Sequence, residues 1–458
     1  MKITGIILYS LIFFSFSNHP TDPRVLPDYW LVTDFGAVAD GKTDNTIAFQ
    51  HAIDSASVKG GRVMMPAGLW LIKGSIQLKP GVSLIGTNTS PLSPYQLTGS
   101  VILATGGRDH EEASPLFEMW NASSAQGFSI YYPEQNTKDI HAYPWTFYLH
   151  NPPLESKDHE KRKETFDVTV ENITLINSYN GIRCGPEENG RHRILSVYGC
   201  VLRRGIFVDW TGDIGRIENV HFHSHYWFHP STKGNWDDVF KYMQEHLEAF
   251  IFGRTDWEYV TNTFVFPAKI GYHFIKTVQG NCNGQFSGIG ADATEIALLA
   301  ESIQSQGLLI TNGQFNSHHI GQSSEIVVGP ECRGSIRFTT CGFWGPAEHN
   351  AVLQGDGDVS FQNCYFSTNF ISGDSLRPNY AIVASHGKLQ VQACTFDGAQ
   401  TDETGQWNYS GAQKKPPSIK LEKGVRFAIL TGNTGYHGVS ILNEAGDHAV
   451  IKDNEPPI

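Results

Sequence analysis

The chain has 458 residues, of which 40% are hydrophobic and 17% are charged, so it is long enough to bury a large core. Its formal net charge is −12 and its basic residues are scattered rather than clustered, which argues against nucleic acid as a partner. The 46 glycines, 22 prolines and 27 phenylalanines favour many short strands joined by turns.

Residues 1–18 read as a secretory signal peptide. Lys2 is followed by a mainly apolar run over 6–16 and then by polar residues. This run is shorter than the roughly 20 apolar residues that a membrane-spanning helix needs, and no later stretch approaches that length. We therefore expect a secreted protein, periplasmic or extracellular, without a membrane span, whose residues 19–458 form one domain.

Several short motifs lie together near the start of this domain. DFGA at 34–37 is followed by DGKTDNT at 40–46, by an amphipathic helical pattern, and by GRVMMPAG at 61–68. A polar residue of the second motif can cap the helix, and the apolar side of the helix can then cover the open end of a stack of strands.

The segment 32–86 resembles the N-terminal cap and first coils of the pectate-lyase-like superfamily of parallel β-helix proteins. The resemblance implies an all-β fold, namely a single right-handed parallel β-helix with an N-terminal capping helix and loop insertions. Residues 29–100 would form the cap and first coils. Superfamily members include polygalacturonases, exo-glucanases, polysaccharide lyases, uronan epimerases and phage tailspikes, so the resemblance implies a carbohydrate-active protein and leaves the substrate open.

The catalytic signatures of individual families in that superfamily do not carry over. The acidic residues typical of polygalacturonases are absent as a set, because the only Asp-Asp pair, Asp237 and Asp238, lies in a helical pattern. The signature of calcium-dependent pectate lyases is also missing. No metal or other cofactor is expected from these motifs, except calcium if the protein is a lyase.

A long interruption is expected at 131–168, where an aromatic stretch is followed by the charged segment ESKDHEKRKE. Aromatic side chains of this kind can stack on sugar rings, although the simpler interpretation is that they pack the loop against the coils.

From about residue 170 a short pattern recurs, consisting of Asn, two residues and an apolar residue, with copies about 20 to 30 residues apart. Each unit is too small to bury its own apolar face, so units must stack, and 169–455 should form the main coils. A β-propeller would need about 40 residues per blade, and a doubly wound fold would need helices between strands. The repeated asparagines are predicted to occupy tight turns: Asn172, Asn219, Asn283, Asn312 and Asn363.

The seven cysteines cannot all pair within one chain. Four of them follow the repeated Asn or its substitute: Cys200, Cys341, Cys364 and Cys394. We expect an inward stack of small apolar side chains rather than a metal site, with a disulfide within the stack as the alternative.

A helical insertion is predicted near 226–248. Asn235 can cap a helix that begins at Trp236, and Val239 and Met243 belong to its apolar stripe. The insertion is rich in aromatic residues and suits either the wall of a binding groove or a contact between subunits. Trp227 and Trp236 are its candidate sugar-binding residues.

The candidate site centres on FGRTDWEYV at 252–260. Alignment of the second strand of each coil makes Val208, Phe252, Phe274 and Leu299 equivalent inward residues. Two positions further on, the alignment gives Trp210, Arg254, Lys276 and Glu301. A groove beside these strands would collect acids, bases and indoles from neighbouring coils.

Those side chains suit glycoside hydrolysis, which needs a carboxylic acid and a carboxylate about 5 to 9.5 Å apart. The leading prediction is therefore a secreted polysaccharide-degrading glycoside hydrolase. Its catalytic candidates are Asp213, Asp256, Glu258 and Asp209, with Asp292 in reserve. Its substrate-binding candidates are Arg254, Lys276, Arg216, Trp210, Trp257, Trp227 and Trp236.

Two alternatives remain open. The first is a polysaccharide lyase acting on a uronic-acid polymer, in which Arg254 and Lys276 neutralise the substrate carboxylate and His273 or Tyr272 removes the proton. The second is a non-catalytic glycan-binding or adhesin-like protein that uses the same aromatic residues. The expected partner is a polysaccharide or oligosaccharide, and assembly into a homotrimer is left open.

Overall fold

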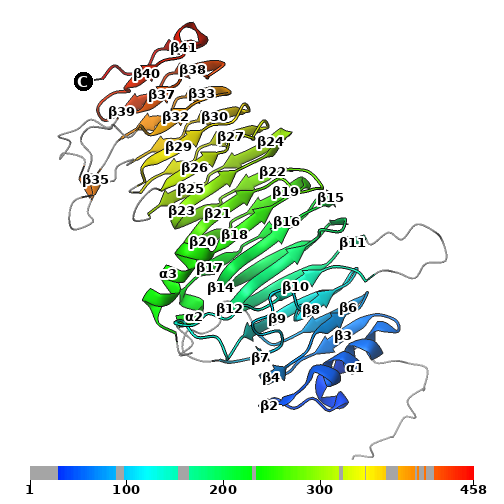
Figure 1. Cartoon of the computed structure of the whole chain (residues 1–458). Helices are drawn as coiled ribbons and strands as arrows, with labels where there is room; N and C mark the ends of the chain where they lie inside the picture. The colour runs from blue at the N-terminus through cyan, green and yellow to red at the C-terminus, as the bar shows by residue number, and fades with distance from the viewer. Residues whose placement is uncertain are drawn as a thin grey trace, which may run out of the picture.

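The computed structural model describes residues 29–88, 97–152, 164–228, 234–318, 323–345, 347–367, 380–397, 400–401, 407–408 and 417–457. The predicted signal peptide at 1–18 lies outside the described residues. The described chain is nearly all β, and its strands stack in parallel from the N-terminal to the C-terminal end (Figure 1). No described helix is long and apolar enough to cross a membrane.

Each strand pairs in parallel with the equivalent strand of the next coil, so the strands form stacked columns. Along the chain, one coil contributes a strand to column A, then to column B, then to column C. Column A contains β1 (Tyr29–Leu31), β3 (Gly61–Met64), β6 (Val82–Ile85), the first parts of β9 (Ser124–Tyr131), β12 (Thr169–Cys184) and β14 (Arg193–Val208), β16 (Arg216–Glu218), β19 (Thr255–Thr261), β22 (Cys282–Ser287), β24 (Ile303–Thr311), β27 (Ser335–Thr339), β30 (Asp358–Gln362), β33 (Lys388–Gln392), β38 (Phe427–Thr431) and β41 (Ala449–Lys452).

Column B follows a tight turn after column A. It contains β2 (Asp40–Asp44), β4 (Gly68–Ile72), β7 (Ser100–Ala104), the later parts of β9, β12 and β14, then β17 (His221–His223), β20 (Phe264–Phe266), the start of β23 (Gly290–Ala300), β25 (Gln314–Ser317), β28 (Gly342–Phe343), β31 (Tyr365–Phe366), β34 (Thr395–Phe396) and β39 (Thr434–Gly435).

Column C completes each coil. It contains β5 (Ile76–Leu78), β8 (Phe117–Met119), β10 (Trp145–Leu149), the ends of β12 and β14, β18 (Glu248–Phe252), β21 (Ala268–Phe274), the end of β23, β26 (Ser324–Val328), β29 (His349–Leu353), β32 (Ile382–Ala384), β37 (Ile419–Leu421) and β40 (Ile441–Asn443). Short strands outside the columns are β11 (Thr165–Phe166), β13 (Asn189–Gly190), β15 (Thr211–Asp213), and the antiparallel pair β35 (Gln400–Thr401) and β36 (Trp407–Asn408).

The helices lie outside the columns. The helix α1 (Thr46–Ser57) follows the short 3-10 helix η1 (Val32–Phe35) and packs with Phe49 and Ile53 buried against β1, β3, β5 and β6 at the N-terminal end of the stack (Figure 1). The predicted insertion forms α2 (His225–Phe228) and α3 (Trp236–His246). A second 3-10 helix, η2 (Gly446–His448), lies near the C-terminus.

The tight turns between columns A and B explain most of the repeated asparagines. Asn172, Asn219, Asn312 and Asn363 all have φ between 50° and 56°, a left-handed conformation that asparagine tolerates better than most residues. The prediction for Asn283 was wrong, since this residue lies inside β22 and Gly288, with φ of 62°, makes the turn of that coil.

The cysteine alignment was correct for three residues. Cys341, Cys364 and Cys394 each follow a turn residue of positive φ and stack inward as buried free thiols. The alignment of Cys200 was wrong, because the turn residue of its coil is Ser196, which places Val197 at the equivalent position.

Two further expectations are corrected by the strand register. Phe274 pairs with Ala300, so Leu299 is not the inward equivalent of Phe274, and Ser302 rather than Glu301 stands two positions further on. The predicted excursion at 131–168 is interrupted by β10, a regular member of column C.

Candidate functional site

Several of the predicted site residues lie between column C and column A, and three others lie at the start of β19. Asp213, Asp256 and Trp257 line one cavity of about 390 Å³, which we call the Asp213 cavity. Gly212, Ile214, Asn283, Gln304 and Gln306 complete its lining. Trp257 is 60% exposed, with a φ of 60°. The sequence alignment therefore brought together side chains that do share a cavity.

Both carboxylates of the Asp213 cavity are already paired with cations. Asp213 Oδ2 lies 2.8 Å from Arg191 Nη1, and Asp256 Oδ2 lies 3.0 Å from Arg254 Nη2. Gln304 Nε2 also donates to Asp256 Oδ1 at 2.9 Å. Arg254, predicted to bind substrate, thus holds a carboxylate of the same cavity.

The other two predicted catalytic acids are buried, which contradicts direct contact with a polymer. Asp209 is 3% exposed and its Oδ1 accepts from the backbone N–H groups of Trp210 and Arg254, at 2.9 and 2.8 Å. Glu258 is fully buried, with Oε1 lying 2.9 Å from Nε2 of the buried His192. Both carboxylates hold the C-to-A turns in place.

The remaining aromatic and basic candidates have separate positions. Trp227 is fully buried in the core, so its predicted role in sugar binding is wrong. Trp236 packs on His225, with ring centroids 4.7 Å apart. Arg216 lies in column A, where its guanidinium carbon is 5.8 Å from the ring of Tyr259. Trp210 occupies a C-to-A turn with a φ of 54°.

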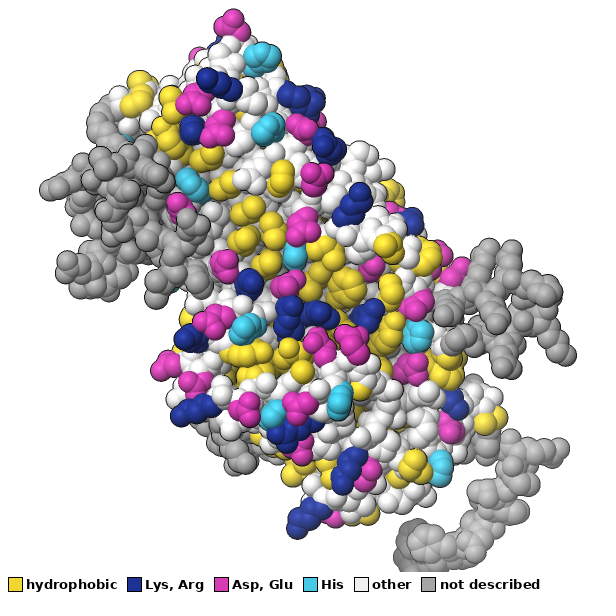
Figure 2. All heavy atoms as spheres, viewed as in Figure 1, with side chains coloured by type: hydrophobic (Ala, Val, Ile, Leu, Met, Phe, Trp, Pro, Cys, Tyr) yellow, Lys and Arg dark blue, Asp and Glu magenta, His cyan; other side chains and the backbone are white. Residues whose placement is uncertain are grey.

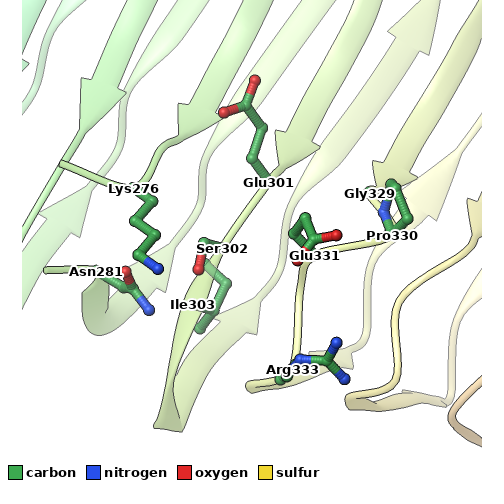
Figure 3. Close-up of a pocket in the computed structure, with 9 residues that line it drawn as sticks. All are labelled: Lys276, Asn281, Glu301, Ser302, Ile303, Gly329, Pro330, Glu331 and Arg333. Carbon is green, nitrogen blue, oxygen red and sulfur yellow. The ribbon is translucent and has the colours of Figure 1, made fainter.

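A larger cavity lies beside the later coils and contains another predicted residue, Lys276 (Figure 3). This Lys276 cavity has a volume of about 590 Å³. The side chains of Lys276 and Asn281 extend toward each other at one end, and Arg333 lies at the other (Figure 3). Arg333 is paired with Asp356 at 2.6 Å, whereas Lys276 forms no ion pair with any residue that the structure describes.

Glu301, on the rim of the Lys276 cavity, is linked to a buried histidine. His273 Nε2 lies 3.2 Å from Glu301 Oε1, and His273 Nδ1 lies 2.9 Å from Glu248 Oε2. Burial lowers the pKa of His273, but the hydrogen bonds with Glu248 and Glu301 outweigh burial and raise it above its ordinary value. The hydrogen bond from His273 lowers the pKa of Glu248 to about 2.

Neither base named for the lyase alternative is freely available. His273 is 9% exposed and held at both ring nitrogens. Tyr272 is fully buried, and its hydroxyl lies 2.8 Å from Thr263 Oγ1. Neither side chain is therefore free to take a proton from a substrate.

A cluster of ionisable side chains lies on the outer side of column C at the strands β8, β10 and β12, and the sequence interpretation missed it. Tyr148 pairs in register with Glu118 on one side and Arg183 on the other. His150 follows Tyr148, and their rings stack with centroids 4.7 Å apart. With Glu187, which accepts from the Tyr148 hydroxyl at 3.0 Å, these residues form what we call the Tyr148 cluster.

The charges of the Tyr148 cluster are arranged around the imidazole. His150 Nε2 lies 3.5 Å from Glu118 Oε1, and His150 Nδ1 lies 3.5 Å from Glu187 Oε2. The guanidinium carbon of Arg183 lies 4.8 Å from the centre of the Tyr148 ring. The Nε atom of Arg183 donates to Gly185 O at 2.9 Å, while its terminal nitrogens make no ion pair with a described residue.

Burial raises the pKa of Tyr148 above its ordinary value, and neighbouring Glu187 adds to the rise, although Arg183 opposes it. The phenol is therefore protonated at neutral pH. One sequence signal pointed to this strand: in WTFYL, Phe147 and Leu149 alternate with Tyr148, as inward and outward residues of a strand do.

Comparison with known protein families gives a match to the N-terminal part of the chain. The model of the family described as rhamnogalacturonase A/epimerase, pectate lyase-like, matches residues 30–102. This match covers the N-terminal segment whose motifs resemble the pectate-lyase-like superfamily. The resemblance predicted from the N-terminal motifs is thus confirmed.

Curated relatives match parts of this chain. It is 31% identical over 129 residues to alginate lyase 7 of Azotobacter vinelandii, covering 24% of this chain and 15% of that protein. It is 43% identical over 58 residues to the mannuronan C5-epimerase AlgE3 of the same organism, covering 12% of this chain and 3% of that protein. The chain therefore spans a small part of the relatives it matches.

Solved structures show the same fold at low identity. A DFA-IIIase of Arthrobacter chlorophenolicus A6 aligns with 94% of this chain and 100% of its own chain, at 10% identity and a TM-score of 0.50. The pre-mature gene product 12 of bacteriophage phi29 aligns with 93% of this chain and 58% of its own, at 11% identity and a TM-score of 0.57. Both likenesses concern the fold alone.

Proposed function

We propose that this protein is a secreted carbohydrate-active enzyme that cleaves a uronic-acid-containing polysaccharide by β-elimination at the Tyr148 cluster. The observation that carries the proposal is the Arg183 guanidinium, which lies over Tyr148 without an ion-pair partner among the described residues and next to the stacked His150. The names of the partial relatives, an alginate lyase and mannuronan epimerases, support a uronic-acid substrate.

The proposed reaction assigns one role to each side chain. Arg183 pairs with the substrate carboxylate and stabilises the negative charge that develops there when the C5 proton leaves. The imidazole of His150 accepts this proton, because, unlike the ring nitrogens of His273, its Nδ1 forms no hydrogen bond with a described residue. Glu118 and Glu187, each 3.5 Å from a ring nitrogen, then stabilise the imidazolium that forms.

Cleavage is then completed by a proton donor. The C4–O bond breaks as the C4–C5 double bond forms, and the leaving oxygen takes a proton from the hydroxyl of Tyr148, which burial keeps protonated. The products are an unsaturated uronate and a new chain end. Removal of the C5 proton is also the first step of C5 epimerisation, so the same group suits either outcome.

The fold suits a polymeric substrate. We infer a single right-handed β-helix in which α1 caps the first coil, so that column C offers a continuous outer surface. Four strand spacings of about 4.8 Å separate Tyr148 from His273, beside the Lys276 cavity. The face in Figure 2 carries charged side chains of both signs among hydrophobic ones over the middle coils. A polysaccharide lying along the coils would reach both places.

The deciding experiment incubates the purified protein with mannuronan and with polygalacturonate. We expect ultraviolet absorbance from the unsaturated product to rise in parallel with reducing ends on at least one polymer. Loss of activity in EDTA would show that the lyase uses a metal ion, for which the sequence analysis allows calcium. New reducing ends without ultraviolet absorbance would contradict elimination.

A second candidate function is glycoside hydrolysis at the Asp213 cavity, where two carboxylates lie beside the exposed Trp257. It predicts that Asp256→Asn abolishes the release of reducing ends while Tyr148→Phe leaves it intact. Elimination at the Tyr148 cluster predicts the opposite pair of results.

A further inference from the structure

A polar surface on column A takes no part in the reaction proposed above. It forms a shallow cavity of about 300 Å³ over β27, β30 and β33. We call it the column A face and define it by its polar lining: Ser335, Arg337, Thr339, Asp358, Ser360, Gln362, Lys388 and Gln390.

Strand register arranges these side chains as a regular array. Arg337 is in register with Ser360, and Ser360 with Gln390; rows of the same kind run on either side. Neighbouring coils are about 4.8 Å apart and alternate residues of a strand about 7 Å apart, so hydroxyl and amide groups recur at regular intervals along the face. The residues between them, such as Ile336 and Phe338, are fully buried and fix the strands.

The charge of the column A face favours an anion. Arg337 is exposed and forms no ion pair with a residue in the described parts of the chain. The acid of the face, Asp358, is instead 3.7 Å from Lys388 Nζ. The guanidinium of Arg337 is thus available, and its fork of N–H donors matches carboxylate or sulfate groups.

An exposed aromatic ring extends the face by one coil. Phe427 is 41% exposed and pairs in register with Lys388. Three strand spacings separate it from the coil of Arg337, about 14 Å, which is the span of an oligosaccharide rather than of one sugar. A flat ring at the edge of a polar array is a stacking surface for the apolar side of a sugar.

We propose that the column A face binds an anionic oligosaccharide, with its acidic group on Arg337, its hydroxyls on the serine and glutamine side chains, and a sugar ring on Phe427. Inward side chains of columns A and C share one core, so their outer faces point in different directions. The column A face therefore holds a second stretch of polymer while column C acts on another. The identity of that polymer rests on the proposed function; the binding does not.

The test measures binding of a fluorescent mannuronate hexasaccharide to protein carrying Tyr148→Phe, so that the probe stays intact. Adding Arg337→Ala is expected to weaken binding at least tenfold at low salt, and Phe427→Ala severalfold. Arg62→Ala is the matched control, because Arg62 is also an exposed column A residue but lies on β3, and it should change affinity less than twofold. All three residues are exposed, so circular dichroism should show unchanged folding.

Further arms separate the outcomes. A sulfated hexasaccharide identifies the preferred anionic group, and Arg337-dependent binding of either probe supports the proposal. Equal binding of neutral cellohexaose overturns the proposal, and so does binding that does not depend on Arg337. A change of oligomeric state caused by Arg337→Ala also overturns it, because the face would then be a contact between subunits. If the wild-type protein cleaves no uronate yet binds through Arg337, the proposed function fails and this inference stands.

Discussion

At the scale of single residues, the interior contains ionisable groups whose chemistry depends on their neighbours. Glu325 is fully buried in column C, and its Oε2 accepts from Asn350 Nδ2 at 2.9 Å. Burial raises the pKa of Glu325 well above its ordinary value, although the hydrogen bond from Asn350 opposes this. Folding therefore favours the protonated form of Glu325, and its hydrogen bond with Asn350 links two strands.

This raised pKa predicts how stability depends on pH. Above the pKa of the unfolded state, the unfolded chain releases the proton and the folded chain keeps it, so the free energy of unfolding falls by about 1.4 kcal/mol per pH unit until the folded group ionises. Glu325→Gln keeps the hydrogen-bonding shape without the charge. We expect equal stability near pH 4 and a more stable variant at pH 8, measured by urea unfolding. Equal stability at both pH values would contradict the assignment.

A second prediction at this scale concerns the proton donor. Tyr148→Phe removes only the hydroxyl that donates to Glu187. If this hydroxyl protonates the leaving oxygen, kcat falls by about 10² to 10⁴ while the melting temperature stays nearly constant. Tyr29→Phe, at a 56% exposed position on β1, is the control and should retain full turnover. A Tyr148→Phe enzyme with wild-type kcat would remove the hydroxyl from the mechanism.

At the scale of elements, α3 shows what local sequence can predict. Asn235 was expected to cap it, and its side chain does accept from Asp238 N at 3.2 Å. The expected apolar stripe is also present, since Val239 and Met243 are fully buried. Helix signals of this kind lie within a few residues of one another, so no tertiary information is needed to recognise them.

Loss of this cap should have a measurable cost. Asn235→Ala leaves the backbone N–H of Asp238 without its side-chain acceptor and should lower the free energy of unfolding by about 1 kcal/mol. Lys241→Ala, on the exposed side of the same helix, should change it by less than about 0.5 kcal/mol. Thermal unfolding of the two variants compares them directly, and an equal effect would show that the cap contributes nothing.

At the scale of the whole molecule, stability comes from contacts between neighbouring coils. Phe361 lies among the rings of Phe338, Phe343 and Phe366, with centroids 5.0, 5.6 and 5.4 Å away. These rings belong to two successive coils, because Phe338 and Phe343 lie on β27 and β28 while Phe361 and Phe366 lie on β30 and β31, so each coil depends on the one beside it.

Removing one ring should therefore loosen several coils together. Phe361→Ala is expected to cost about 3 to 5 kcal/mol, because the buried cavity cannot collapse. Hydrogen exchange followed by mass spectrometry should show faster exchange in β27, β30 and β33 than in β3 and β6. Phe427→Ala, at an exposed ring, is the control, and exchange that accelerates evenly along the chain would contradict coupling between nearest neighbours.

The sequence determined the features that depend on short spacing. It predicted the repeating strands, the turns at Asn172, Asn219, Asn312 and Asn363, the Cys341 stack and the insertion helix, because each is encoded within a few residues. Tertiary structure decided register, since a shift of one residue moves a side chain to the other face of a strand. Such shifts misplaced Leu299 and Glu301.

Tertiary structure also decided which polar residues are accessible. Asp209, Glu258 and Trp227 have suitable chemistry in the sequence, yet the folded chain buries them. No shared motif links Arg183 to Tyr148 and His150, which precede it by up to 35 residues. Only the parallel pairing of β10 with β12 brings these side chains together. A site assembled across coils depends on contacts between distant segments, and local sequence patterns do not record those contacts.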